Sequence, residues 1–147
     1  MTDTLENHKA SVRRFYDDLW NKWNYSLVGE LMTPDIGFHG SLGVQKNGHE
    51  GFIQYAEMVR SAFPDFTNSV EDLIAEGNKV AACLTYRGTH LGEIFGIEPT
   101  GRSFRYIGTA VFVFRDGLIS NAWVLGDRLE LLQQLNGAHP DDSALEM

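Results

Sequence analysis

The sequence predicts an α+β fold, in which helices come first along the chain and a run of antiparallel strands follows. Apolar residues recur at helical spacing up to Phe63, and from Phe66 onward they recur at the alternating spacing of strands. No internal repeat, linker or second apolar core interrupts this order. We therefore expect one domain over residues 1–147, with residues 136–147 as a flexible tail.

The first expected helix is amphipathic and lies near the N-terminus. Its apolar residues recur at i, i+3, i+4, i+7, i+8 and i+11, which is the spacing of one helical face. They are Val12, Phe15, Tyr16, Leu19, Trp20 and Trp23. A shorter helical turn is expected over residues 27–32, because Pro34 disfavours helical backbone in the residue before it. A short strand over residues 35–42 follows.

A second amphipathic helix is expected to begin at Asn47. Asn47 is a favourable N-cap residue, and Glu50 follows three positions later, as in a capping box. The apolar stripe behind this start comprises Phe52, Tyr55, Ala56, Val59 and Phe63. Pro64 ends the helix, because proline cannot continue the backbone hydrogen bonds.

Four strands and a last helix are expected in the second half of the chain. The strands cover residues 66–75, 79–89, 103–115 and 118–125, and the helix covers residues 127–135. Gly77-Asn78 and Asp116-Gly117 are turn sequences, so they predict two hairpins. The connection over residues 88–102 is long for a hairpin, and loops of this length are often functional.

Alternation along the last two strands separates an inward face from an outward face. One face of the 103–115 strand carries its aromatic residues and is expected to lie under the helices. It comprises Phe104, Tyr106, Gly108, Ala110, Phe112 and Phe114. In the 118–125 strand, Val124 lies on the face opposite to Trp123. Aromatic residues under a helix are either core or the wall of an apolar pocket.

The composition argues against several classes of partner. The net charge is −8 and the pI is about 5.0, whereas nucleic acids and anionic membrane surfaces attract clustered Lys and Arg. No apolar run approaches the roughly 18 residues of a membrane-spanning helix, and the first residues are too polar for a signal peptide. The single cysteine, Cys83, permits no internal disulfide. We expect a cytoplasmic protein that binds neither nucleic acid nor membrane.

Two residues are candidates for moving a proton. Asp127 follows the last strand, where a carboxylate beside an apolar wall would suit a general acid or base. Asp127 with Glu130 also spells a capping box, so both roles stay open. A neutral imidazole at His39 could relay a proton or bind a substrate carbonyl, or His39 could be a half-buried histidine with a satisfied hydrogen bond.

Aromatic and cationic residues supply the expected lining of a pocket for a hydrophobic small molecule. The candidates that shape the pocket are Trp20, Tyr55, Phe63, Tyr106, Phe112 and Trp123. Arg87 and His90 could steer an acidic or phenolic substrate at the mouth. No metal-binding spacing such as H-x-H, H-E-x-x-H or C-x-x-C occurs, and no phosphate-binding glycine motif occurs. We therefore expect chemistry without metal or cofactor.

The motifs of the 88–135 block are G-T-H-L-G-E at 88–93, G-I-E-P-T-G-R at 96–102, R-D-G-L-I at 115–119, Trp123, Asp127 and Q-Q-L at 133–135. Upstream pieces agree, including Pro34-Asp35 with His39 and Ala62-Phe63-Pro64-Asp65. Together they resemble the SnoaL-like polyketide cyclase family, whose members are also called ester cyclases. The similarity spans most of the chain.

The resemblance implies a cone-shaped α+β barrel like that of nuclear transport factor 2. A bent antiparallel sheet would wrap around the helices and leave a central pocket, and the protein would form homodimers or higher homo-oligomers. The family's cyclases close a ring by intramolecular aldol condensation on an aromatic polyketide ester, with an Asp acid/base and a nearby His. In an ungapped comparison those two positions fall at Val124 and Ala110.

Two functions follow as expectations. The first is a cofactor-independent enzyme that cyclises, isomerises or hydroxylates a carbonyl-bearing hydrophobic molecule through an enol. The second is a non-catalytic ligand-binding or dimeric scaffold module of the same fold, which the residues at Val124 and Ala110 favour because neither can move a proton.

Overall fold

Helices make up most of the first half of the chain, and strands make up most of the second half. In the first half they are α1 (Thr4–Arg14), the π-helical segment η1 (Phe15–Trp20), the 3₁₀ turn η2 (Tyr25–Leu27), α2 (Val28–Leu31), β1 (Met32–His39), β2 (Gln45–Asn47) and α3 (Gly48–Ala62). In the second half they are β3 (Thr67–Glu76), β4 (Lys79–Thr89), β5 (Ser103–Arg115), β6 (Leu118–Gly126) and α4 (Arg128–Leu135). The bounds expected for β4 and β5 are those observed.

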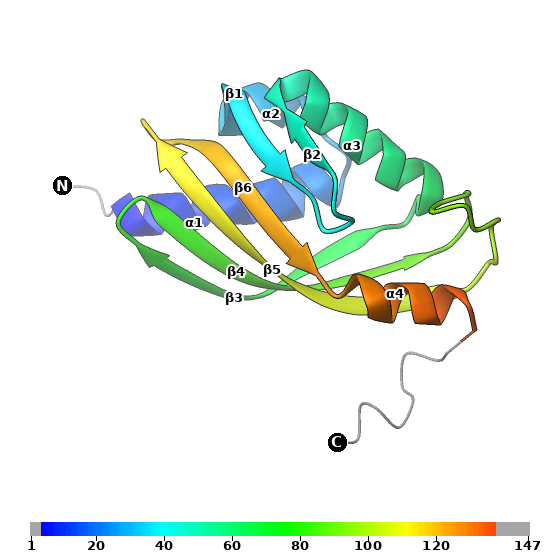
Figure 1. The fold of residues 1–147 in the computed structure, drawn as a ribbon. Coiled ribbons are helices and arrows are strands. Elements are labelled where there is room, and N and C mark those ends of the chain that lie inside the picture. The colour runs from blue at the N-terminus through cyan, green and yellow to red at the C-terminus, as the bar shows by residue number, and fades with distance from the viewer. Residues whose placement is uncertain (1–3, 138–147) are drawn as a thin grey trace.

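The six strands form one curved sheet in the order β2-β1-β6-β5-β4-β3 (Figure 1). The fold is that of a computed structural model, which describes residues 4–137. It confirms the expected α+β fold, with helices packed on a curved sheet. Residues 138–147 of the expected flexible tail lie outside the described residues.

The β5–β6 hairpin forms where its turn sequence predicts it. Asp116 and Gly117 both have positive φ, of 54° and 82°, which is the backbone that a two-residue hairpin turn requires. The strands then pair along their length, from Arg115 with Leu118 to Gly108 with Gly126. The register shifts between Val113 and Phe114, so the turn alone does not decide which side chains face inward.

The sheet departs from a purely antiparallel one at β1, which pairs in parallel with β6. No turn sequence predicts this pairing, because the two strands are far apart in the chain. The strand also begins at Met32, earlier than expected, and its register with β6 is irregular between Met32 and Gly37. Pro34 lies in this irregular stretch, where its missing N–H is tolerated.

The start of α3 differs from the expected capping box. Asn47 occupies the N-cap position, but its side chain makes no capping hydrogen bond. Asn47 is also the last residue of β2, and its Oδ1 accepts a hydrogen bond from Gln45 Nε2 at 3.4 Å. The side chain of Asn47 therefore does not cap α3 as the sequence predicted.

The core lies between the helices and the inward face of the sheet, as strand alternation predicts. Phe104, Tyr106, Ala110, Phe112 and Phe114 are all buried on that face. Phe112 contacts the first helical layer through Phe15, with ring centroids 5.2 Å apart. Among the helices of residues 4–137, none is long and apolar enough to cross a membrane.

The contact between Gly40 and Tyr55 gives a test of this packing. A Cβ at Gly40 would lie 2.1 Å from Cζ of the Tyr55 ring, so Gly40→Ala must displace that ring. We expect a loss of about 1–3 kcal/mol in the free energy of unfolding, measured by urea denaturation. Gly29→Ala is the control, because nothing lies within 4 Å of the added Cβ and alanine favours helix α2. Equal free energies for the two variants would contradict the packing described here.

Candidate functional site

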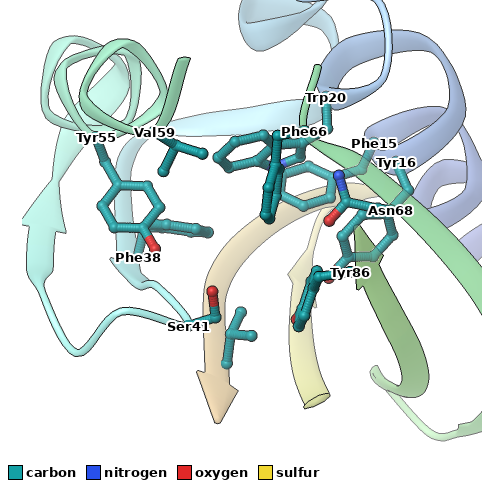
Figure 2. A pocket seen from close by; sticks show the side chains of 11 residues that line it. Phe15, Tyr16, Trp20, Phe38, Ser41, Tyr55, Val59, Phe66, Asn68 and Tyr86 are labelled. Carbon is teal, nitrogen blue, oxygen red and sulfur yellow. The ribbon is translucent and has the colours of Figure 1, made fainter. Parts of the chain in front are cut away.

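A narrow aromatic cavity lies between η1, α3 and the inward face of the sheet (Figure 2). It is lined by Phe15, Tyr16, Trp20, Phe38, Ser41, Tyr55, Val59, Phe66, Asn68, Tyr86 and Val124. The space among these side chains is about 290 Å³, including the part open to solvent. Only about 20 Å³ is free for the centre of a water molecule, which is room for about one water. The aromatic rings themselves therefore fill most of the cavity.

The π-helical segment supplies three of the lining residues, Phe15, Tyr16 and Trp20. Its wider turn is visible in two backbone hydrogen bonds that span five residues, from Asn21 N to Tyr16 O and from Asn24 N to Leu19 O, each 2.9 Å long. Short π-helical segments occur frequently at functional sites. Here the segment faces the cavity with three aromatic side chains.

Three tyrosines line the cavity and a fourth, Tyr106, contacts the lining residue Ser41; their hydroxyls differ in hydrogen bonding. Tyr55 Oη accepts a hydrogen bond from the backbone N–H of Leu42 at 3.1 Å. Tyr106 Oη lies 3.2 Å from Ser41 Oγ, so one of the two hydroxyls donates to the other. The hydroxyls of Tyr16 and Tyr86 are buried and have no hydrogen-bond partner among the described residues.

The cavity is electrically neutral, because none of its lining side chains is charged. Burial raises the pKa of Tyr55 to about 12 and raises the pKa values of Tyr16, Tyr86 and Tyr106. Neighbouring tyrosines raise the pKa of Tyr86 further, with Tyr16 the first of them. All four side chains are therefore neutral phenols at physiological pH, able to donate a hydrogen bond but not to act as a base.

Ala110 and Val124 lie opposite each other on the inward face. They are cross-strand partners in β5 and β6, and both are buried. The alternation that placed these two positions inward is confirmed. Because neither side chain ionises, the pair provides no acid or base.

Some of the residues expected in a pocket do meet in the interior. Trp20 and Tyr55 line the cavity, and Tyr106 reaches it through Ser41. Phe63 and Phe112 are fully buried but belong to the core around the cavity. Phe63 packs on Phe104 with ring centroids 4.5 Å apart, and Phe112 packs on Phe15 and Tyr16.

His39 and Trp123 lie together on the outward face of the sheet. Their residues are register partners in β1 and β6, and their rings stack with centroids 5.7 Å apart. Trp123 is 46% exposed, so it does not line the interior cavity. His39 Nδ1 donates to the backbone carbonyl oxygen of Val124 at 3.2 Å, which fixes the proton on Nδ1 in the neutral ring.

Arg87 and Asp127 both line a groove on the outward side of the sheet. It is lined by Glu71, Thr85, Arg87, Arg105, Tyr106, Ile107, Asp127 and Glu130. Asp127 is exposed, and its Oδ1 accepts a hydrogen bond from the backbone N–H of Glu130 at 3.1 Å. The capping role expected for Asp127 is thus confirmed.

His90 lies in the interior of the loop after β4, whereas the sequence placed it at a pocket mouth. Its side chain is fully buried and contacts Phe63 edge-on. Nδ1 accepts a hydrogen bond from the backbone N–H of Thr100 at 3.2 Å, so Nε2 carries the proton. The backbone of His90 also bonds to that of Gly101 and Arg102. The histidine therefore holds the two ends of the long loop together.

Sequence reasoning did not single out Tyr16 and Tyr86 as site residues. Tyr16 belongs to the apolar stripe of the first helix, and Tyr86 shares the inward face of β4 with Val80, Ala82 and Leu84. Both patterns also describe ordinary core residues. What distinguishes the two residues is that their hydroxyls lack hydrogen-bond partners, and only the three-dimensional structure shows this.

Comparison with known proteins gives a consistent result. A family model described as SnoaL-like polyketide cyclase matches residues 10–135. Nogalonic acid methyl ester cyclase of Streptomyces nogalater is 33% identical over 120 residues, which cover 78% of this chain and 87% of that protein.

Solved structures share the fold. A protein of Jannaschia sp. CCS1, assigned as a SnoaL-like polyketide cyclase, superposes with a TM-score of 0.85 at 20% identity, covering 95% of this chain and 98% of the other. IdmH of Streptomyces antibioticus, assigned as a polyketide cyclase, superposes with a TM-score of 0.76 at 29% identity, covering 88% and 98%.

The neutral tyrosines predict a loss of stability at high pH. In an unfolded chain tyrosine ionises near pH 10, whereas burial raises the pKa of Tyr55 to about 12 and also raises those of Tyr16, Tyr86 and Tyr106. Their contribution to stability is therefore complete below about pH 10 and is lost as the pH rises toward 12. Each such tyrosine steepens the loss by about 1.4 kcal/mol per pH unit.

Urea denaturation and phenolate absorbance, followed between about pH 9 and 12, check this expectation. Phenolate from the four tyrosines should appear together with unfolding. Ionisation of all of them near pH 10 in a folded protein would show that the hydroxyls are not buried as described.

Proposed function

The chain belongs to the SnoaL-like polyketide cyclase family, and we propose that it acts without a cofactor on a hydrophobic, carbonyl-bearing small molecule. The reaction is a cyclisation, isomerisation or hydroxylation of polyketide type that passes through an enol. The observation that carries this proposal is the neutral aromatic cavity with its ring of phenol hydroxyls. The cytoplasm is the compartment in which we place it.

The cavity suits one part of such a reaction, the polarisation of the substrate's carbonyl group by hydrogen-bond donors. Aromatic walls bury the rings of a ligand, and a neutral O–H can donate to a carbonyl oxygen. When a proton leaves the carbon beside that carbonyl, negative charge develops on the oxygen. Hydrogen-bond donors fixed at that oxygen in a site without water stabilise the charge.

A base is also needed to take the proton, and the residues lining the cavity supply none. We propose His39 and Asp127 for proton handling, the two candidates that the sequence offered. Both flank Val124, which lines the cavity: His39 bonds to its carbonyl oxygen, and Asp127 follows three residues later. Their side chains lie outside the cavity, so a substrate must extend past the end of β6 to reach them.

A second function is favoured by Ala110 and Val124. A cross-strand pair without an ionisable group is what a ligand-binding module of this fold would have, since binding needs no proton transfer. In that function Trp20, Tyr55 and Tyr106 hold the ligand, and no bond changes. In either function the aromatic side chains that line the cavity must move apart to admit the ligand, because they nearly fill it.

The test is incubation of the purified protein with aromatic polyketide acid methyl esters, followed by mass spectrometry and chromatography. We expect a product with its own retention time and, for cyclisation, the mass of the substrate. Asp127→Asn or His39→Gln should lower turnover roughly 10²–10⁴-fold if that residue handles the proton. Asparagine retains the helix cap at position 127, so a loss of activity would not reflect unfolding.

Asp116→Asn is the matched control, because it makes the same change at a turn residue whose positive φ asparagine tolerates. Unchanged turnover in both site variants would remove His39 and Asp127 from the mechanism. A ligand that binds and is never altered would favour the non-catalytic module. A protein that neither binds nor alters any of these esters would contradict both functions.

We further propose that the protein forms a homodimer through the outward face of β5 and β6. Ile107, Leu125 and Trp123 expose 63%, 59% and 46% of their surface there. Exposed apolar clusters mark interaction sites, and a two-fold interface uses the same patch on both copies. A second copy of this chain is therefore the partner that we assign to the face.

Light scattering after size-exclusion chromatography checks the dimer. Ile107→Glu should convert a dimer into monomers, because it places two like charges in a desolvated interface. Met58→Glu is the control, as Met58 is exposed on α3, away from the outward face of the sheet. Monomers in the unsubstituted protein would overturn this assignment, as would a dimer that survives Ile107→Glu.

A further inference from the structure

Two hydroxyls in the interior cavity have no hydrogen-bond partner, and this absence points to a ligand. We propose that Tyr16 and Tyr86 form a two-donor site for the carbonyl or enol oxygen of an uncharged, flat, aromatic ligand. The inference deepens the proposed function and rests on it, since it names the groups that would hold the reacting oxygen.

Both residues line the same cavity. Tyr16 comes from η1 and Tyr86 from β4, and each side chain is only 2% exposed. Figure 2 shows the two rings with Asn68 on one side of the cavity, facing Tyr55 and Val59 on the other. Neither hydroxyl has a partner among the described residues.

An unpaired buried hydroxyl costs free energy that a phenylalanine would avoid. The same cavity contains Phe15, Phe38 and Phe66, so phenylalanine fits this environment. The hydroxyls of Tyr16 and Tyr86 therefore weaken the packing of the empty protein. A ligand atom that accepts hydrogen bonds from these hydroxyls would offset that free-energy cost.

The acceptor is a neutral oxygen. Burial raises the pKa of both phenols, so their protons are in place to be donated. A carboxylate or phosphate would have to lose its hydration in a cavity whose lining carries no positive charge. A ketone, ester or enol oxygen meets two donors there without that cost.

The free space fits one such atom. The room for about one water also accommodates an oxygen atom, and we place the ligand's oxygen there as the acceptor for both donors. The ligand's rings would then take the place of aromatic side chains that move aside. Only a flat, apolar body can follow the oxygen between these aromatic walls. An aromatic ketone or ester, as in the proposed function, therefore fits the two donors, whereas a sugar, an amine or an acid does not.

The experiment uses acetophenone and 2-acetylnaphthalene, both labelled with ¹³C at the carbonyl, as probes of two sizes. Bound to the protein, the carbonyl infrared band should lie at lower frequency than in hexane. Tyr16→Phe and Tyr86→Phe should each remove part of that shift and weaken binding by about 2- to 10-fold. Tyr25→Phe is the control, because Tyr25 bonds to Glu57 on the surface and should leave the band unchanged.

The melting temperature without ligand distinguishes a ligand-binding role of the two hydroxyls from a structural role. If the hydroxyls are unpaired in the empty protein, Tyr16→Phe and Tyr86→Phe should each raise Tm without ligand by about 2–4 °C. A lowered Tm would show that the hydroxyls already have a partner, such as a buried water, and would overturn the proposal. Failure of either ketone to bind, or a carbonyl band that both variants leave unchanged, would overturn it as well.

The outcomes also separate this proposal from the proposed function. If the protein turns over an aromatic ester but neither variant changes the carbonyl band, the two-tyrosine site is overturned and the enzyme stands. A shifted band without turnover would support the site and favour the ligand-binding module.

Discussion

The interior of this protein depends on the strict alternation of side chains along β4 and β5. Tyr86 and Tyr106 are cross-strand partners on the inward face, and their rings lie 4.7 Å apart. Gly108 leaves the space for Tyr86, since a Cβ there would lie 2.7 Å from that ring. A shift of one residue in β4 would turn Tyr86 to solvent, and the same shift in β5 would turn Tyr106 to solvent.

Much of the fold could be predicted because its signals are local. The β5–β6 turn carries a glycine that accepts positive φ, and alternation within each strand places Ala110 and Val124 inward. The parallel pairing of β1 with β6 could not be predicted, because it joins segments separated by most of the chain. Asn47 shows the same limit at a smaller scale, since its side chain accepts a hydrogen bond from Gln45 and makes no capping bond.

The candidate site could be predicted only in part. Helical periodicity found Trp20 and Tyr55, but the same spacing also marks Phe63, and strand alternation marks Phe112; both of these are core. Trp123 lies on the face of β6 opposite to Val124, so its alternation already argues for the outward side on which it lies. The hydrogen-bonding state of a hydroxyl depends on atoms from several elements, and no pattern in one strand or helix carries it.

The π-helical segment has a consequence for how the cavity could change. Each residue turns an α-helix by about 100°, so removing or adding one residue within η1 would rotate everything on one side of it relative to the other. Phe15 and Trp20 sit at the two ends of that segment. An insertion or deletion within η1 would therefore rotate Phe15 and Trp20 relative to each other and change which aromatic rings face the cavity.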